Sequence, residues 1–271
     1  MRAILFPTDF SERSQQALDQ AIVYAEKFSM KLIIYHAYHR PVTEWDTSRQ
    51  LKRTLDDLEK DIDARFQKLL EQHKKLSTVN YEFRKELGLF IENVIDAAQE
   101  KDVQLIIMAT KGARGFGELW GTKTARIIKS VRVPVLVLPD HTNLEAIGKV
   151  GLVCDYSKET NYHTLDFLLE LAETLKLDVD VVTLNRDKKT MTTQELAYQQ
   201  LVRKKLEDVP TTFNFSFNSN VENGIVEYSM NNDIGLIVIL PKSYPFIEGL
   251  FRESLTQKMA FHSPLPLLVL K

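Results

Sequence analysis

The chain has 271 residues, of which 44% are hydrophobic and 27% are charged, and its formal net charge is −2. This length fits one large domain or two of ordinary size, and the composition is that of a soluble globular protein. The near-neutral charge, without a Lys/Arg-rich block, argues against nucleic acid as a partner. The single cysteine, Cys154, excludes an internal disulfide. No apolar run approaches the ~20 residues of a membrane span, so we expect a cytoplasmic protein without membrane contact.

Short apolar runs alternate with amphipathic segments through the first half of the chain. The runs predict strands at 3–6, 32–35, 79–83, 105–109 and 135–138. The longest helix is predicted from apolar residues at steps of three or four, namely Leu51, Leu55, Leu58, Ile62, Phe66 and Leu69. Strands that alternate with helices predict a parallel sheet covered on both faces.

The same order of elements begins again after a polar stretch at 141–149. The sequence ILFPTDFS at 4–11 is answered by GLVCDYS at 151–157, and PVLVL at 134–138 by PLLVL at 266–270. A predicted helix at about 192–208 corresponds to the long helix of the first half. We therefore predict two copies of one α/β domain, at 1–140 and 150–271, joined by a linker at 141–149.

Residues 104–139 combine an apolar run, a glycine-rich loop and the start of a helix. Gly112, Gly115 and Gly117 lie in the loop, and Gly121-Thr122 opens the helix. Free backbone N–H groups and the positive end of a helix dipole favour a bound anion, so this unit could hold a phosphate. A glycine-rich surface loop without a ligand is the plain alternative.

With these residues in view, the chain resembles a tandem universal stress protein. The features that carry the resemblance are PTDFS after the first strand, the loop-helix unit at 105–122, and the terminal PVLVLP strand. The resemblance implies an α/β fold of two tandem Rossmann-like domains, each a five-stranded parallel sheet flanked by helices. The two domains would form an intrachain pseudo-dimer in which strands 135–138 and 267–270 pair.

The resemblance also implies a site for ATP or another adenine nucleotide in the first half. Matched position by position, the nucleoside would meet Pro7, Thr8, Asp9 and the backbone of Ala37, and the phosphates would meet Ala109, Gly112, Gly121 and Thr122. The family loop has Gly, two residues, Gly, nine residues, then Gly-Ser or Gly-Thr. Here Ala109 replaces the first glycine, and eight residues separate Gly112 from Gly121.

The second half departs further from the family pattern, so no nucleotide is expected there. Asp155 keeps the acidic position of Asp9. Glu253-Ser254 stand where the closing glycine and hydroxyl belong, and a carboxylate at a helix N-terminus occupies the place that a phosphate would need. The other replacements are Val153-Cys154 for Pro7-Thr8, Leu184 for Ala37, and Ser243 for Gly112.

Several of these residues also have purely structural interpretations. Asp9 and Thr122 fit helix N-caps, and Cys154 fits a small buried hydrophobe. The basic residues beside the loop (Lys111, Arg114 and Lys123) suit either phosphate screening or a solvated surface. The six histidines show no metal-ligand spacing, and no catalytic constellation stands out, so we expect neither a metal nor an enzyme.

Three functions remain open at this point. The first is a stress-response protein that binds an adenine nucleotide in its N-terminal half. The second is a nucleotide-free module that acts through an unknown protein partner. The third, a slow nucleotide hydrolase, has the least support, because Asp9 is the only obvious carboxylate for a metal or a base.

Overall fold

A computed structural model describes residues 1–39, 48–110, 122–156, 162–185, 191–217, 221–240 and 265–271. The chain divides into two compact units, Met1–Met108 and Ala109–Lys271. The predicted boundaries at 140 and 150 stay a prediction. None of the helices that the structure describes is both long and apolar enough to cross a membrane.

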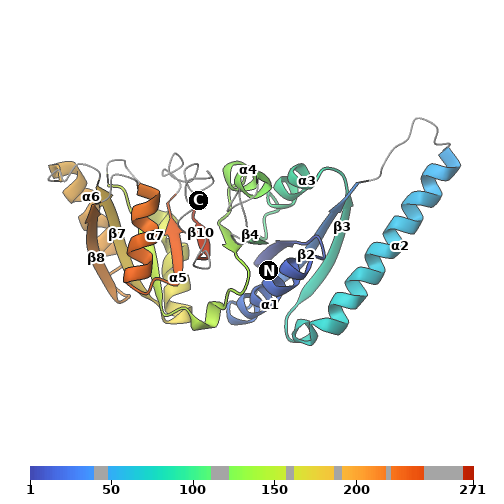
Figure 1. Cartoon of the computed structure of the whole chain (residues 1–271), viewed down its shortest axis with the longest axis horizontal. Coiled ribbons are helices and arrows are strands. Elements are labelled where there is room, and N and C mark those ends of the chain that lie inside the picture. Colours follow the sequence, from blue (N-terminus) through green and yellow to red (C-terminus); the bar gives the residue numbers. More distant parts are fainter. Residues whose placement is uncertain (40–47, 111–121, 157–161, 186–190, 218–220, 241–264) are drawn as a thin grey trace. The chain divides into compact units, whose positions relative to one another are not determined.

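The first unit is built on four parallel strands in the order β3-β2-β1-β4 (Figure 1). Strand β1 is buried along its whole length, as the apolar run at its start predicts. The elements of the first unit in chain order are β1 (Ala3–Pro7), α1 (Glu12–Lys27), β2 (Lys31–Tyr38), α2 (Ser48–Gln72), the 3-10 helix η1 (Lys74–Thr78), β3 (Tyr81–Leu87), α3 (Phe90–Ala97) and β4 (Val103–Ala109). The last residue of β4 belongs to the second unit.

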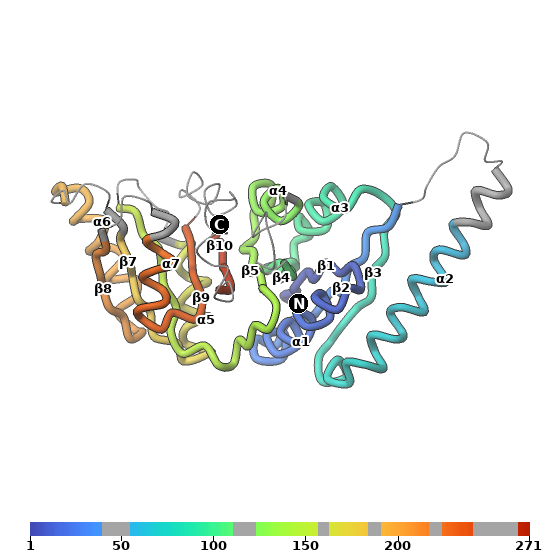
Figure 2. The backbone as a smooth tube through the Cα atoms, viewed as in Figure 1, coloured from blue at the N-terminus to red at the C-terminus, as the bar shows by residue number. Residues whose placement is uncertain are grey.

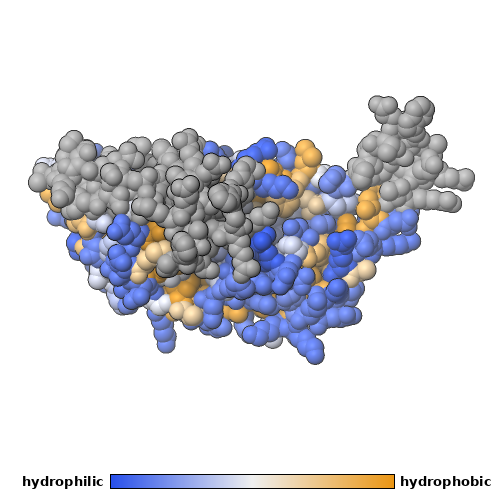
Figure 3. Space-filling view, viewed as in Figure 1, coloured by the Kyte–Doolittle hydropathy of each residue, from blue (hydrophilic) through white to orange (hydrophobic). Residues whose placement is uncertain are grey.

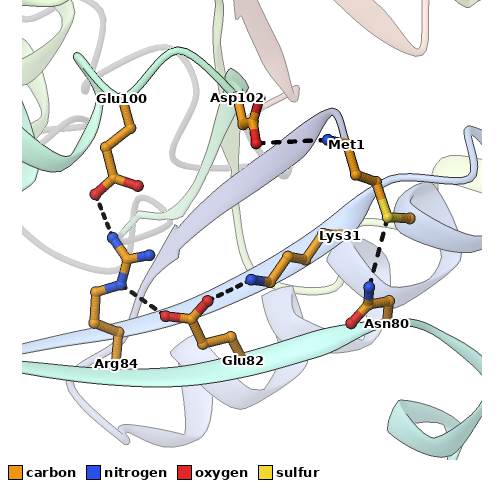
Figure 4. Close-up of polar contacts among 7 residues, drawn as sticks. All are labelled: Met1, Lys31, Asn80, Glu82, Arg84, Glu100 and Asp102. Atoms are coloured by element: carbon orange, nitrogen blue, oxygen red, sulfur yellow. Dashed lines mark hydrogen bonds and ion pairs between the residues drawn. The ribbon is translucent and has the colours of Figure 1, made fainter.

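Helix α2 is confirmed, and its apolar stripe is buried toward the end of the helix, while Leu55 and Leu58 are half-buried and the side chain of Leu51 lies outside the described part. Ile62, Phe66 and Leu69 are all buried, and the Phe66 ring stacks on Phe83 of β3 with 4.6 Å between ring centroids. The opposite face of β3 carries charge instead. Glu82 accepts from Lys31 at 2.5 Å and from Arg84 at 3.0 Å, and Arg84 also pairs with Glu100 (Figure 4). Strand β3 is the end strand of its unit, and this network covers one of its faces with ion pairs.

The second unit orders its strands as β5-β10-β9-β6-β7-β8. Strand β10 lies between β9 and β5 (Figure 2). It runs parallel to β9 and antiparallel to β5, with Leu267 opposite Val137. The predicted pairing of the two terminal strands is therefore confirmed. The elements are α4 (Thr122–Ser130), β5 (Val135–Leu138), η2 (Leu144–Ala146), β6 (Lys149–Val153), η3 (Tyr162–Thr164), α5 (Leu165–Leu175), β7 (Asp178–Asn185), α6 (Thr193–Lys205), β8 (Thr211–Phe217), α7 (Val221–Asn231), β9 (Leu236–Ile239) and β10 (Leu267–Val269).

Matching backbone hydrogen bonds relate the first five strands to the last five. Lys31 N donates to Arg2 O at 2.9 Å, and Asp178 N donates to Gly148 O at 3.0 Å. In each half the donor is the first residue of the second strand, and the acceptor is the residue directly before the first strand. The predicted α/β fold with parallel strands and flanking helices is confirmed in both halves. On the face shown in Figure 3, hydrophilic side chains cover most of the described surface.

Candidate functional site

The residues that follow β1 form a tight turn tied to β2. Thr8 N donates to Tyr35 O at 2.8 Å, which continues the β1–β2 ladder by one residue. The Thr8 side chain is only 4% exposed, and its hydroxyl lies 2.7 Å from the Ser14 hydroxyl of α1. The same oxygen accepts from Phe10 N at 3.0 Å. Thr8 is thus an internal brace of the turn.

Phe10 holds this turn in an unusual backbone conformation, with φ at 63°. A non-glycine residue in the left-handed region is strained by about 1–3 kcal/mol, so its surroundings must hold it there. The Phe10 ring lies 4.6 Å from the His36 ring and 5.1 Å from Phe66, in edge-to-face geometry with the latter. Gln15 Nε2 also donates to Phe10 O at 3.1 Å. Packing against β2 and α2 therefore fixes the turn.

Asp9 stands at the tip of this turn with its side chain exposed. The expectation that Asp9 caps α1 is wrong. Ser11 is the N-cap, and its hydroxyl accepts from Ser14 N at 3.3 Å. Asp9 Oδ1 instead accepts from Ser11 N at 3.0 Å, because the left-handed Phe10 turns the chain between Asp9 and the helix. The carboxylate is held by the backbone and faces solvent, directly after the first strand.

His36 lies beside the turn near the end of β2. Its Nδ1 is 2.7 Å from Thr8 O. A carbonyl can only accept, so Nδ1 carries the proton and a neutral His36 ring has its lone pair on Nε2. Burial lowers the pKa of His36, and the hydrogen bond to Thr8 opposes this only in part. The neutral ring is thus favoured beside Phe10.

Ala37 follows His36 in β2, half-buried and opposite Glu86 of β3. The neighbouring tyrosines of β2 reach acidic side chains. Tyr38 OH donates to Glu59 Oε1 at 2.8 Å, and Tyr35 OH donates to Glu86 Oε2 at 2.5 Å. Burial and the Glu59 carboxylate raise the pKa of Tyr38 to about 12. These two hydrogen bonds hold β2 in place just before and just after Ala37.

Two of the four residues predicted to meet phosphate lie outside the described residues. Ala109 is the half-buried last residue of β4. Gly112 and Gly121 lie outside the described part, and Thr122 is described only as the first residue of α4. Thr110, which the sequence analysis did not single out, is 5% exposed, and its hydroxyl has no hydrogen-bond partner among the described residues. Its backbone N donates to Leu138 O of β5 at 3.0 Å.

The second half repeats the turn after its first strand with different side chains. Cys154 N donates to Val182 O at 3.0 Å, as Thr8 N does to Tyr35 O, and Asp155 is exposed like Asp9. Cys154 is 3% exposed, and burial raises the pKa of its thiol to about 12. The side chain therefore stays protonated near neutral pH, in agreement with the interpretation as a small hydrophobe.

Comparison with known proteins shows the family of the chain. A model of the universal stress protein family matches residues 1–139. The chain belongs to this family. A curated universal stress protein of Methanocaldococcus jannaschii is 25% identical over 152 residues, which are 51% of this chain and 94% of that protein.

Comparison with solved structures extends the similarity to nearly the whole length of this chain. A universal stress protein from Archaeoglobus fulgidus has a TM-score of 0.73 and 15% identity, and the match covers 99% of this chain and 98% of that one. A functionally unknown protein from Pseudomonas aeruginosa has a TM-score of 0.60 and 15% identity, with 100% and 92% covered. At these identities the likeness concerns the fold. Among the described residues of this universal stress protein, no group of three or more His, Cys, Asp or Glu side chains could hold a metal ion.

Proposed function

We propose that this universal stress protein binds an adenine nucleotide in its N-terminal half. The observation that carries the proposal is the exposed Asp9 carboxylate, fixed by Ser11 N at the carboxyl end of β1. In open α/β sheets, ligands bind outside the carboxyl ends of the strands. A carboxylate at that edge is suited to accept hydrogen bonds from the hydroxyls of a ribose.

Two neighbouring features support the nucleoside side of the proposal. Ala37 lies near the carboxyl end of β2 and has a small side chain, which leaves its backbone approachable by a base. Pro7 ends β1 and Thr8 is buried, so both shape the turn and leave Asp9 as the exposed polar group. The roles of Ala109, Gly112, Gly121 and Thr122 toward the phosphates stay a prediction from the sequence.

The second half supplies the matched control for this proposal. Asp155 occupies the same place after β6, yet we propose that this half binds no nucleotide and is a universal stress protein domain that serves as a scaffold. The wild-type chain is compared with Asp9→Asn and Asp155→Asn by melting temperature in ATP, in ADP and without ligand. Saturation at 100 times the dissociation constant stabilises a folded state by about 2.7 kcal/mol.

We expect ATP to raise the melting temperature of the wild type and of Asp155→Asn by several degrees, and that of Asp9→Asn by much less. Fluorescence of Trp120 in a Trp45→Phe background gives an independent titration. No shift in the wild type at millimolar ligand would leave the nucleotide-free interaction module as the function. Equal losses in the two variants would refute a site confined to the first half.

We further propose that the protein acts through binding and not through catalysis. Hydrolysis of ATP needs a positioned water and groups that stabilise charge on the phosphates, and Asp9 alone does not supply them. Purified protein should therefore release no more phosphate from ATP than Asp9→Ala prepared in parallel. A turnover that the wild type shows and Asp9→Ala lacks would overturn this part of the proposal.

A further inference from the structure

Strand β8 is the end strand of the second unit and carries no charged residue. Its sequence, TTFNFSF, alternates phenylalanines with small polar residues. End strands of soluble proteins are usually protected by charge, proline or a covering element, because their free backbone groups pair readily with another strand. We propose that β8 is an interface at which two copies of this chain pair antiparallel, edge to edge.

Strand β3, the end strand of the first unit, is protected by charge. Strand β3, YEFRKEL, carries four charged residues, Glu82, Arg84, Lys85 and Glu86. Lys85 stands at the position of Phe215 in the repeat and pairs with Asp63 of α2 at 2.6 Å. Two copies of β3 would have to break such ion pairs or place like charges together, whereas two copies of β8 meet no such cost.

The covering helix also differs between the two strands. Helix α2 spans 25 residues and buries Phe66 against Phe83, whereas α6 spans 13 residues. Arg203 of α6 lies over the Phe213 ring, 3.7 Å from its centroid. Phe215, one step further along the same face, is 44% exposed. An exposed phenylalanine on an uncharged end strand is a surface that a second strand can cover.

The backbone of β8 favours one pairing register. Val179 N donates to Pro210 O, so the even-numbered residues of β8 direct their backbone groups toward β7. Phe213 and Phe215 therefore direct theirs away from β7, to the free edge. If Asn214 lies on the two-fold axis, Phe213 of one copy forms a hydrogen-bonded pair with Phe215 of the other. The same register sets Thr212 opposite Ser216.

This register matches side chains as well as backbone groups. On one face it brings an aromatic ring opposite an aromatic ring, and on the other a hydroxyl opposite a hydroxyl. Both kinds of cross-strand pair stabilise antiparallel strands. A two-fold axis makes each pair occur twice, which is how a self-complementary interface forms from one strand.

Sedimentation velocity of the full chain over a range of concentrations tests the interface. The wild type should show a concentration-dependent dimer. Phe215→Lys, which places at β8 the charge that Lys85 gives to β3, should raise the dissociation constant at least tenfold. Leu87→Lys is the matched control, because Leu87 is 55% exposed at the end of β3, and it should leave the dimer unchanged. Circular dichroism establishes that both variants are folded, and Phe215→Glu replaces Phe215→Lys if the latter is not.

Cysteine cross-linking tests the register. Thr212→Cys mixed with Ser216→Cys should form an intermolecular disulfide under mild oxidation, because the opposed Cα atoms of such a pair lie about 4.5 Å apart. Either variant alone should form far less. A wild type that stays monomeric overturns the proposal, as does a dimer that Phe215→Lys leaves intact. A dimer that Phe215→Lys disrupts but that gives no disulfide in the mixture overturns the antiparallel register.

Discussion

Removal of the Phe66 ring should both destabilise the protein and loosen the turn that carries Asp9. Phe66 is 3% exposed, and its ring packs against the rings of both Phe83 and Phe10. A buried Phe→Ala substitution costs about 3–5 kcal/mol of unfolding free energy. Each aromatic pair supplies about 0.5–1.5 kcal/mol beyond its buried area, so about 1–3 kcal/mol of the loss depends on ring geometry.

Urea unfolding followed by circular dichroism measures this loss. We expect Phe66→Leu, which keeps much of the apolar volume, to recover about 2 kcal/mol of what Phe66→Ala loses. Leu69→Ala is the control, since Leu69 is 2% exposed on the same stripe and its aliphatic side chain forms no aromatic pair with Phe10. Amide exchange at Phe10 and Ser11 should accelerate more in Phe66→Ala than in Leu69→Ala. A loss below 1 kcal/mol, or equal exchange in the two variants, would refute the reasoning.

Three further predictions concern other parts of the chain. Because burial raises the pKa of Cys154 to about 12, a thiol reagent at pH 7 should label it only after unfolding; rapid labelling of folded protein would contradict this. Because burial lowers the pKa of His36, the stability that His36 contributes is present above pH 6.5 and is lost as the pH falls below 6.5. The midpoint of urea unfolding should therefore decrease from pH 8 to pH 4, and it should decrease less in His36→Asn. Thr192 and Glu195 form a capping box on α6, so Thr192→Ala should cost about 1 kcal/mol of unfolding free energy and the exposed neighbour Thr193→Ala less than half as much.

The strands and the long helix could be predicted because their residues repeat at the periods of buried structure. Strand β5 begins and ends where its apolar run does, and α2 follows the stripe through Phe66. Strand β8 and helix α7 received no prediction. The signal for β8 is an alternation of phenylalanine and polar residues, and β8 has no continuous apolar run of the kind by which the other strands were predicted.

The candidate site was less predictable, because its geometry depends on a backbone angle. Thr8, Asp9 and Ser11 all have side chains that can cap a helix, and composition does not choose among them. The left-handed Phe10 makes the choice, and it is held there by rings from β2 and α2 that are remote in sequence. The brace between Thr8 and Ser14 is likewise a product of tertiary packing.

The place of β10 in the second unit has a consequence for the order of events during synthesis. Strand β10 lies between β5 and β9, and Val137 pairs with Leu267, far downstream. Until residues 267–269 leave the ribosome, β5 lacks this neighbour and β9 presents a bare apolar edge. Closure of so long a loop is slow, because its entropy must be lost before the contact forms. Nascent chains should therefore depend on chaperones during this interval, and truncation before residue 267 should leave them aggregation-prone, however well β6, β7 and β8 have already folded.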